Sequence, residues 1–108
     1  MAALHAVQVV HRDLKSDNVL LEAPVGPSDP PVAKLCDFGL SKNLENGSTT
    51  STAMIPQGFN PSEHHAPEIA ANDLHGTPVD VFSFAALVAD LALGAGGLVE
   101  HWPGACIR

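Results

Sequence analysis

Positively charged residues are scarce in this chain. Only 5 of its 108 residues are Lys or Arg, against 12 Asp or Glu, and the formal net charge is −7. Because there is no basic stripe or patch, we expect neither nucleic acid nor an anionic membrane surface as a partner. The balance of 45% hydrophobic and 16% charged residues is that of a globular chain, with room for one small domain.

Cysteine is also rare, and long apolar runs are lacking. Cys36 and Cys106 lie far apart in the sequence, so we interpret both as free thiols, which suits a reducing compartment. Asp80 and Asp90 interrupt the longest apolar stretches, so no transmembrane span is expected. The N-terminal "MAALHAVQVV" has no basic leading segment and is a poor signal peptide. These features together favour a cytoplasmic location.

Short structural elements separated by turn signals are expected along the chain. Residues 1–8 are rich in Ala and Leu and indicate the end of a helix. The β-branched and apolar runs at 9–10 and 19–21 predict two short strands that flank a charged loop. Another strand is predicted at 32–36, and the polar residues 41–60 indicate a long mobile loop.

The stretch "TPVDVFSFAALVADLALG" predicts the longest helix. Thr77 is expected to cap its N-terminus, Pro78 suits the first helical position, and Asp80 completes a pattern like a capping box. Gly94 is expected to end it. Residues 79–93 are apolar around nearly the whole circumference, which is typical of a helix buried in a larger body than this chain supplies.

Three short motifs indicate which chemistry the chain carries out. "HRDLKSDN" begins at His11, "DFG" begins at Asp37 and ends at Gly39, and "APE" ends at Glu68. In that order they resemble the catalytic loop, the metal-binding loop and the end of the activation segment of the protein kinase family. "DVFSFA", at the start of the predicted long helix, resembles the family's D-x-W-S-x-G.

The resemblance implies an α+β fold. We expect an incomplete protein kinase fold, with only the mainly helical C-terminal lobe and short β-strands around the catalytic and DFG loops. Residues 1–93 are interpreted as a partial kinase domain and residues 94–108 as a divergent tail. The Gly-rich loop, the V-A-I-K lysine and its partner glutamate are expected to be absent, because the sequence opens within the helix that leads to the catalytic loop.

The same resemblance implies phosphoryl transfer from ATP, with Mg²⁺, to a protein substrate. Asp13 would accept the proton of the substrate hydroxyl, and Lys15 would lie near the γ-phosphate. Asn18 and Asp37 would supply the oxygen ligands that Mg²⁺ prefers. A lysine in "HRDLK" resembles the serine/threonine kinases, and "LKSDNVLL" with "KLCDFGLSK" resembles their tyrosine-kinase-like group.

Supporting roles follow from the resemblance for further residues. Leu20 matches the apolar contact beneath the adenine ring, and Cys36 would border the nucleotide pocket or, alternatively, be a small buried hydrophobic residue. His11 and Phe38 match stacked side chains that link the two lobes. Asp80 matches an aspartate that accepts hydrogen bonds from the backbone of the catalytic loop.

Regulation by phosphorylation is a hypothesis that the resemblance raises. Thr49 and Thr50 lie in the activation segment, and Arg12 matches the residue that in many kinases pairs with a phosphate added there. Alternatively, this Ser/Thr run is a solvated flexible loop. Two departures from the family pattern concern the same region. Pro61 replaces a threonine that contacts the catalytic loop, and the arginine that pairs with Glu68 has no identifiable counterpart.

We therefore interpret the chain as a piece of a serine/threonine protein kinase, and we do not expect the isolated chain to be active. One alternative is a truncated, non-catalytic product that binds a partner through its apolar faces, as pseudokinase-like scaffolds do. Another is an incomplete gene model or a remnant that does not fold. The retention of the catalytic and metal-binding residues argues against decay of the site.

Overall fold

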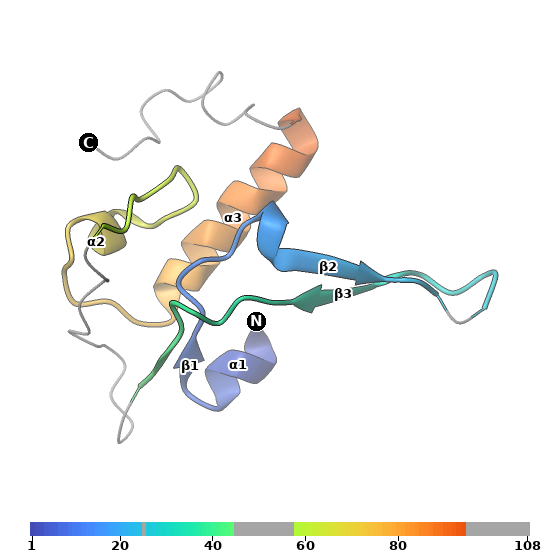
Figure 1. Ribbon diagram of the computed structural model, residues 1–108, viewed down its shortest axis with the longest axis horizontal. Helices are drawn as coiled ribbons and strands as arrows, with labels where there is room; N and C mark the ends of the chain where they lie inside the picture. The colour runs from blue at the N-terminus through green and yellow to red at the C-terminus, as the bar shows by residue number, and fades with distance from the viewer. Residues whose placement is uncertain (25, 45–57, 95–108) are drawn as a thin grey trace.

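The computed structural model describes residues 1–24, 26–44 and 58–94. These ranges contain short helices and short antiparallel strands, in agreement with the expected α+β class (Figure 1). In chain order the elements are α1 (Ala2–Ala6), β1 (Val9–Val10), a 3₁₀ turn (Ser16–Asn18), β2 (Val19–Glu22), β3 (Val32–Leu35), β4 (Lys42–Asn43), α2 (Pro67–Ala70) and α3 (Pro78–Leu93).

The strands form two antiparallel pairs. β2 and β3 make a hairpin in which Val19 lies opposite Leu35 and Glu22 lies opposite Val32. This hairpin projects away from the helices (Figure 1). β1 pairs with β4, which lies within the segment expected to be a loop. That expectation was wrong for residues 42–43, because their strand geometry comes from pairing with β1 and not from any apolar alternation of their own.

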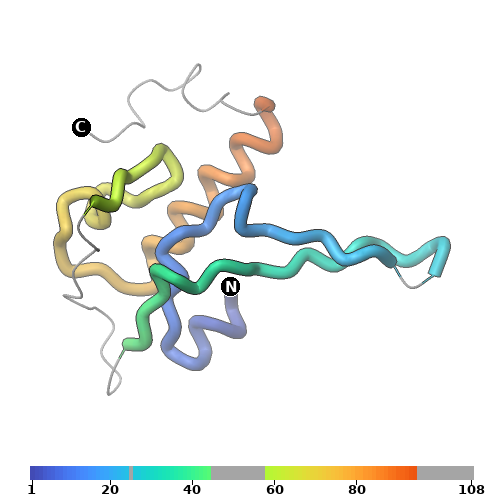
Figure 2. Tube along the Cα trace, in the orientation of Figure 1, coloured from blue at the N-terminus to red at the C-terminus, as the bar shows by residue number. Residues whose placement is uncertain are grey.

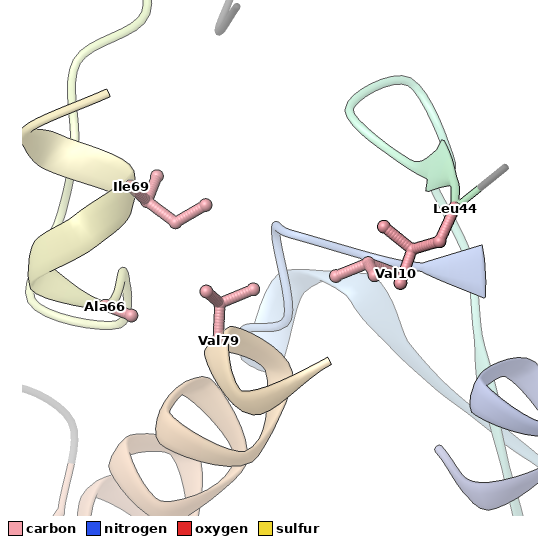
Figure 3. Close-up of a cluster of buried hydrophobic side chains, with 5 residues drawn as sticks. All are labelled: Val10, Leu44, Ala66, Ile69 and Val79. Atoms are coloured by element: carbon pink, nitrogen blue, oxygen red, sulfur yellow. The ribbon is translucent and has the colours of Figure 1, made fainter. Parts of the chain in front are cut away.

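A small hydrophobic core joins segments that are far apart in the sequence (Figure 3). It brings together β1, the residue after β4, the start of α2 and the first turn of α3, with Phe59 packed against it. Its buried members are Val10, Leu44, Ala66, Ile69 and Val79. Because Val10 immediately precedes the "HRDLKSDN" stretch, burial of this core fixes the start of that loop against the two C-terminal helices.

The longest helix, α3, buries one face and exposes the other. The buried residues follow helical spacing and are Val79, Asp80, Ser83, Ala86 and Leu87. The exposed large hydrophobic residues of the same helix are Val81, Phe82, Phe84, Val88, Leu91 and Leu93. This agrees with a helix that is apolar on all sides. None of the helices in the described ranges has the length and apolarity needed to cross a bilayer.

The expected cap of α3 is wrong in one respect. Thr77 is the N-cap residue and Pro78 opens the helix, but the Thr77 side chain makes no capping hydrogen bond. The Asp80 carboxylate does not complete a capping box, because it accepts backbone N–H groups from another part of the chain. Gly94 ends the helix with φ 89°, a left-handed conformation that favours glycine. Of the other expectations, Cys106, residues 45–57 and the tail beyond Gly94 lie outside the described residues.

Candidate active site

Asp80 holds the beginning of the "HRDLKSDN" loop against α3. Its Oδ2 accepts the backbone N–H of His11 at 2.9 Å, and its Oδ1 accepts that of Arg12 at 2.8 Å. The Nε2 of His5 lies 2.8 Å from the same Oδ2. Arg12 has φ 68°, an uncommon backbone conformation for an arginine. The two charge-assisted hydrogen bonds to a fully buried carboxylate stabilise that turn. Figure 2 shows the loop passing close to the first turn of α3.

Three of the residues expected to be catalytic lie in one hydrogen-bonded group. The side-chain amide of Asn18 donates to the Asp13 carbonyl oxygen at 2.7 Å and to Asp13 Oδ2 at 3.1 Å. The Nζ of Lys15 lies 3.2 Å from the same Oδ2. The 3₁₀ turn Ser16–Asn18 folds the chain back, so that Asn18 reaches Asp13 from only five positions away.

The "DFG" stretch lies beside Asp13, Lys15 and Asn18, because hydrogen bonding between the two sides of the β2–β3 hairpin continues one step beyond the strands. The backbone N–H of Cys36 donates to the Asn18 carbonyl at 3.0 Å. Asn18, just before β2, and Asp37, just after β3, are therefore brought to the same end of the hairpin. Asp37 is exposed, has φ 58°, and its Oδ1 accepts the Gly39 N–H at 3.1 Å.

His11 links the two loops. Its Nδ1 accepts the Asp13 N–H at 3.3 Å, and its Nε2 donates to the Cys36 carbonyl at 3.1 Å. Its ring meets the Phe38 ring edge to face, with centroids 5.1 Å apart and planes at 63°. His11 is fully buried, whereas Phe38 is exposed. The expected stacking pair is thus in contact.

A residue that the sequence interpretation did not place in the site also reaches Asp13. His65 Nε2 lies 3.1 Å from Asp13 Oδ1, although the two residues are 52 positions apart. The Nδ1 of His65 accepts the Ser62 backbone N–H at 2.8 Å and lies 2.9 Å from the Ser62 hydroxyl. Burial lowers the pKa of His65 below its ordinary value, and the Asp13 carboxylate opposes that shift. The loss of the threonine at Pro61 was the one signal that a different side chain would contact the catalytic loop.

The guanidinium of Arg12 also has partners within the fold. Its Nε donates to the Leu40 carbonyl, and a terminal nitrogen lies 3.3 Å from His75 Nε2. Burial lowers the pKa of the guanidinium, while the Asp80 carboxylate raises it. Its expected phosphate partners, Thr49 and Thr50, lie outside the described residues.

The remaining predicted site residues lie around this centre, and the hydrogen bonds of Cys36 described above come from its backbone. Leu20 is 56% exposed on β2. Cys36 is half-buried, which differs from the alternative of a small buried hydrophobic residue. Glu68 lies in the first turn of α2 and is half-buried.

Comparisons with known proteins agree with this arrangement. Residues 1–100 match the model of the protein kinase domain family. The chain is 34% identical over 110 residues to the serine/threonine-protein kinase PkaB of Streptomyces coelicolor, with 100% of the chain and 26% of that protein covered. It is 37% identical over 94 residues to the "Probable serine/threonine-protein kinase 2" of Plasmodium falciparum, with 87% and 17% covered. It is 33% identical over 87 residues to the cysteine-rich receptor-like protein kinase 29 of Arabidopsis thaliana, with 81% and 12% covered.

The chain thus spans about a quarter or less of the length of these relatives. The family model covers all the described residues. On the strength of that match and of the geometry above, this chain belongs to the protein kinase family.

Proposed function

We propose that this chain carries the catalytic centre of a serine/threonine protein kinase, which in the complete protein transfers the γ-phosphoryl group of ATP to serine or threonine hydroxyls. The observation that carries the proposal is the grouping of Asp13, Lys15 and Asn18 through one carboxylate oxygen. The names of two relatives, both serine/threonine-protein kinases, and the lysine in "HRDLK" support the choice of hydroxyl.

Phosphoryl transfer depends on positioning and charge stabilisation more than on covalent chemistry by the protein. Asp13 is 7% exposed, and its carboxylate is fixed by neighbouring donors, so it can hold a substrate hydroxyl in one orientation and accept its proton. Lys15 lies against the same carboxylate and is half-buried, which places a positive charge where negative charge develops on the phosphoryl oxygens.

Asn18 and Asp37 fit a magnesium ion. Both offer oxygen atoms at the same end of the β2–β3 hairpin. The Asn18 amide nitrogen already donates to Asp13, so its Oδ1 is the atom turned away from that carboxylate, and the Asp37 carboxylate is exposed. Hard oxygen donors of this kind suit Mg²⁺, which together with ATP would supply the phosphoryl group and neutralise its charge.

We place these residues in the C-terminal lobe of the kinase fold, with the partial domain ending near residue 93. The exposed Leu20, on β2, is the proposed contact for the adenine ring, and Cys36 borders the same pocket. A reducing cytoplasmic location is part of the proposal and is supported by the free thiol of Cys36.

The test is phosphate transfer from labelled ATP to serine-, threonine- and tyrosine-containing peptides by the complete reading frame that contains these 108 residues. We expect Asp13→Asn to lower kcat by about 10²- to 10⁴-fold, the usual contribution of a general base. Asp17→Asn is the matched control, because Asp17 is an exposed acidic residue of the same loop. Equal activity of Asp13→Asn and the unchanged protein would contradict the proposed role, and transfer to tyrosine alone would contradict the substrate class.

A non-catalytic binding protein is the second candidate, favoured by the exposed hydrophobic residues of α3. In that case the complete protein would show no transfer to any peptide. Its partner complex would also form equally well with and without Asp13→Asn. The kinase proposal requires instead that the complete protein transfer phosphate to a serine- or threonine-containing peptide.

A further inference from the structure

His65 occupies a defined place in the site that its position in the sequence did not reveal. Its side chain is 4% exposed, and its Nε2 lies 3.1 Å from Asp13 Oδ1. Its ring packs edge to face against Phe59, with centroids 4.8 Å apart and planes at 88°. The neighbouring His64 turns the other way, and its Nε2 lies 2.7 Å from Asp90 Oδ2 on α3. Two adjacent histidines therefore contact two different carboxylates.

The hydrogen bonds of Ser62 determine which ring nitrogen of His65 carries the proton. The Ser62 backbone N–H donates to Nδ1 at 2.8 Å, so the lone pair of Nδ1 is in use. In a neutral imidazole the proton then lies on Nε2, which donates to Asp13 Oδ1. The turn is closed by the His65 N–H, which donates to the Ser62 carbonyl at 3.0 Å. The histidine is thus oriented by its own turn before it meets the carboxylate.

The two oxygens of Asp13 are used unequally. Oδ2 lies near both the Asn18 amide, at 3.1 Å, and the Lys15 ammonium, at 3.2 Å. Among the described residues, His65 is the one hydrogen-bond partner of Oδ1, at 3.1 Å. A carboxylate oxygen has two lone-pair positions, so Oδ1 retains one for an incoming hydroxyl. Donors on both oxygens also prevent rotation of the carboxylate.

We propose that His65 is a positioning residue, which holds Asp13 so that Oδ1 is the oxygen that receives the proton of the substrate hydroxyl. This inference rests on the proposed kinase function. The exposed Pro61, which stands in place of the family's threonine, offers neither a hydroxyl nor an N–H. The imidazole N–H of His65, four positions later, supplies the donor from the same segment.

Three variants of the complete reading frame test the role of His65 in catalysis. His65→Phe keeps an aromatic ring but removes the donor, and we expect it to lower kcat on the order of 10²-fold with KM for ATP nearly unchanged. His65→Gln retains an N–H donor and should recover most of that loss. His64→Gln is the matched control, because His64 contacts Asp90 and not Asp13, and it should retain the original kcat. A His65→Phe enzyme as active as the original would overturn the proposal.

A measurement without catalysis separates this inference from the proposed function. Long-range ¹H–¹⁵N spectra of the histidine rings in the complete protein should show His65 as the Nε2–H tautomer near neutral pH. Its Nε2 resonance should shift in Asp13→Asn, and the His64 resonances should stay in place. If the spectra show these features and no phosphate transfer occurs, the kinase proposal fails while the His65–Asp13 contact stands. A proton on Nδ1 alone, or an unshifted His65 in Asp13→Asn, would sink the inference itself.

Discussion

The carboxylate of Asp80 accepts the backbone N–H of Arg12 at 2.8 Å, across 68 positions of sequence. This bond and its neighbour to the His11 N–H attach the "HRDLKSDN" loop to the first turn of α3. The loop therefore depends on the helix for its conformation. The Asp80 carboxylate, which holds the loop, does not cap the N-terminus of its own helix.

Replacing Asp80 tests that dependence. Asp80→Asn leaves one oxygen acceptor but places an amide donor where two donors already converge, so a buried N–H loses its partner. We expect the free energy of unfolding of the complete protein to fall by roughly 1–3 kcal/mol, the usual cost of an unsatisfied buried donor. Chemical denaturation measures it. The same substitution at the exposed Asp73 is the control, and an equal effect at both positions would refute the bracing role.

The sequence predicted the parts of the site that depend on local spacing. Asp13, Lys15 and Asn18 lie within one loop, and their spacing around the 3₁₀ turn brings the side chains together whatever the rest of the fold does. The position of Asp37 beside Asn18 follows from the two strands between them. An antiparallel hairpin brings the end of its second strand next to the start of its first.

Long-range relationships were not predictable in the same way. The contact of His65 with Asp13 requires α2 to pack beside the loop, and nothing in the local pattern of "SEHHAPE" distinguishes His65 from His64. Asp80 does not complete the expected capping box, because its carboxylate accepts the backbone N–H of Arg12 instead. In both cases tertiary packing decided between side-chain partners that local sequence left equal.

Gly39 leaves room for the carboxylate of Asp37. A Cβ at this position would lie 3.1 Å from Asp37 Oδ1, closer than an ordinary van der Waals contact. Gly39→Ala should therefore displace a proposed metal ligand and weaken binding of Mn²⁺, used as a probe for Mg²⁺, by several-fold or more. Paramagnetic broadening or titration calorimetry with the complete protein measures it, and Asp37→Asn serves as the positive control. Unchanged Mn²⁺ affinity in Gly39→Ala would show that Asp37 does not ligate the ion in this conformation.

The lowered pKa of His65 gives the fold a dependence on pH. In the unfolded chain His65 binds a proton near its ordinary pKa of 6.5, whereas the folded protein takes up that proton only at lower pH. The unfolded state therefore binds more protons in this window, and the free energy of unfolding should fall as pH decreases from about 7 through the folded pKa. The groups that face His65 are Asp13, whose negative charge raises its pKa, and Lys15, whose positive charge lowers it.

Unfolding of the complete protein between pH 7 and pH 5 measures this effect. His65→Gln has no titrating side chain and should show a smaller slope than the original protein. Identical slopes for His65→Gln and the original protein would mean that His65 titrates alike in the folded and unfolded states.

The exposed face of α3 predicts how the 108-residue chain behaves alone. Val88 is 47% exposed and Leu91 is 75% exposed, so an isolated chain presents apolar surface that favours self-association. The double substitution Val88→Lys and Leu91→Lys should raise the monomeric fraction, measured by light scattering after size exclusion, without loss of helical circular dichroism. Leu87→Lys is the control, because Leu87 is 6% exposed and a lysine there should disrupt packing. If the original chain is already monomeric at high concentration, this face does not drive association, and the expectation that the helix needs a larger body around it would fail.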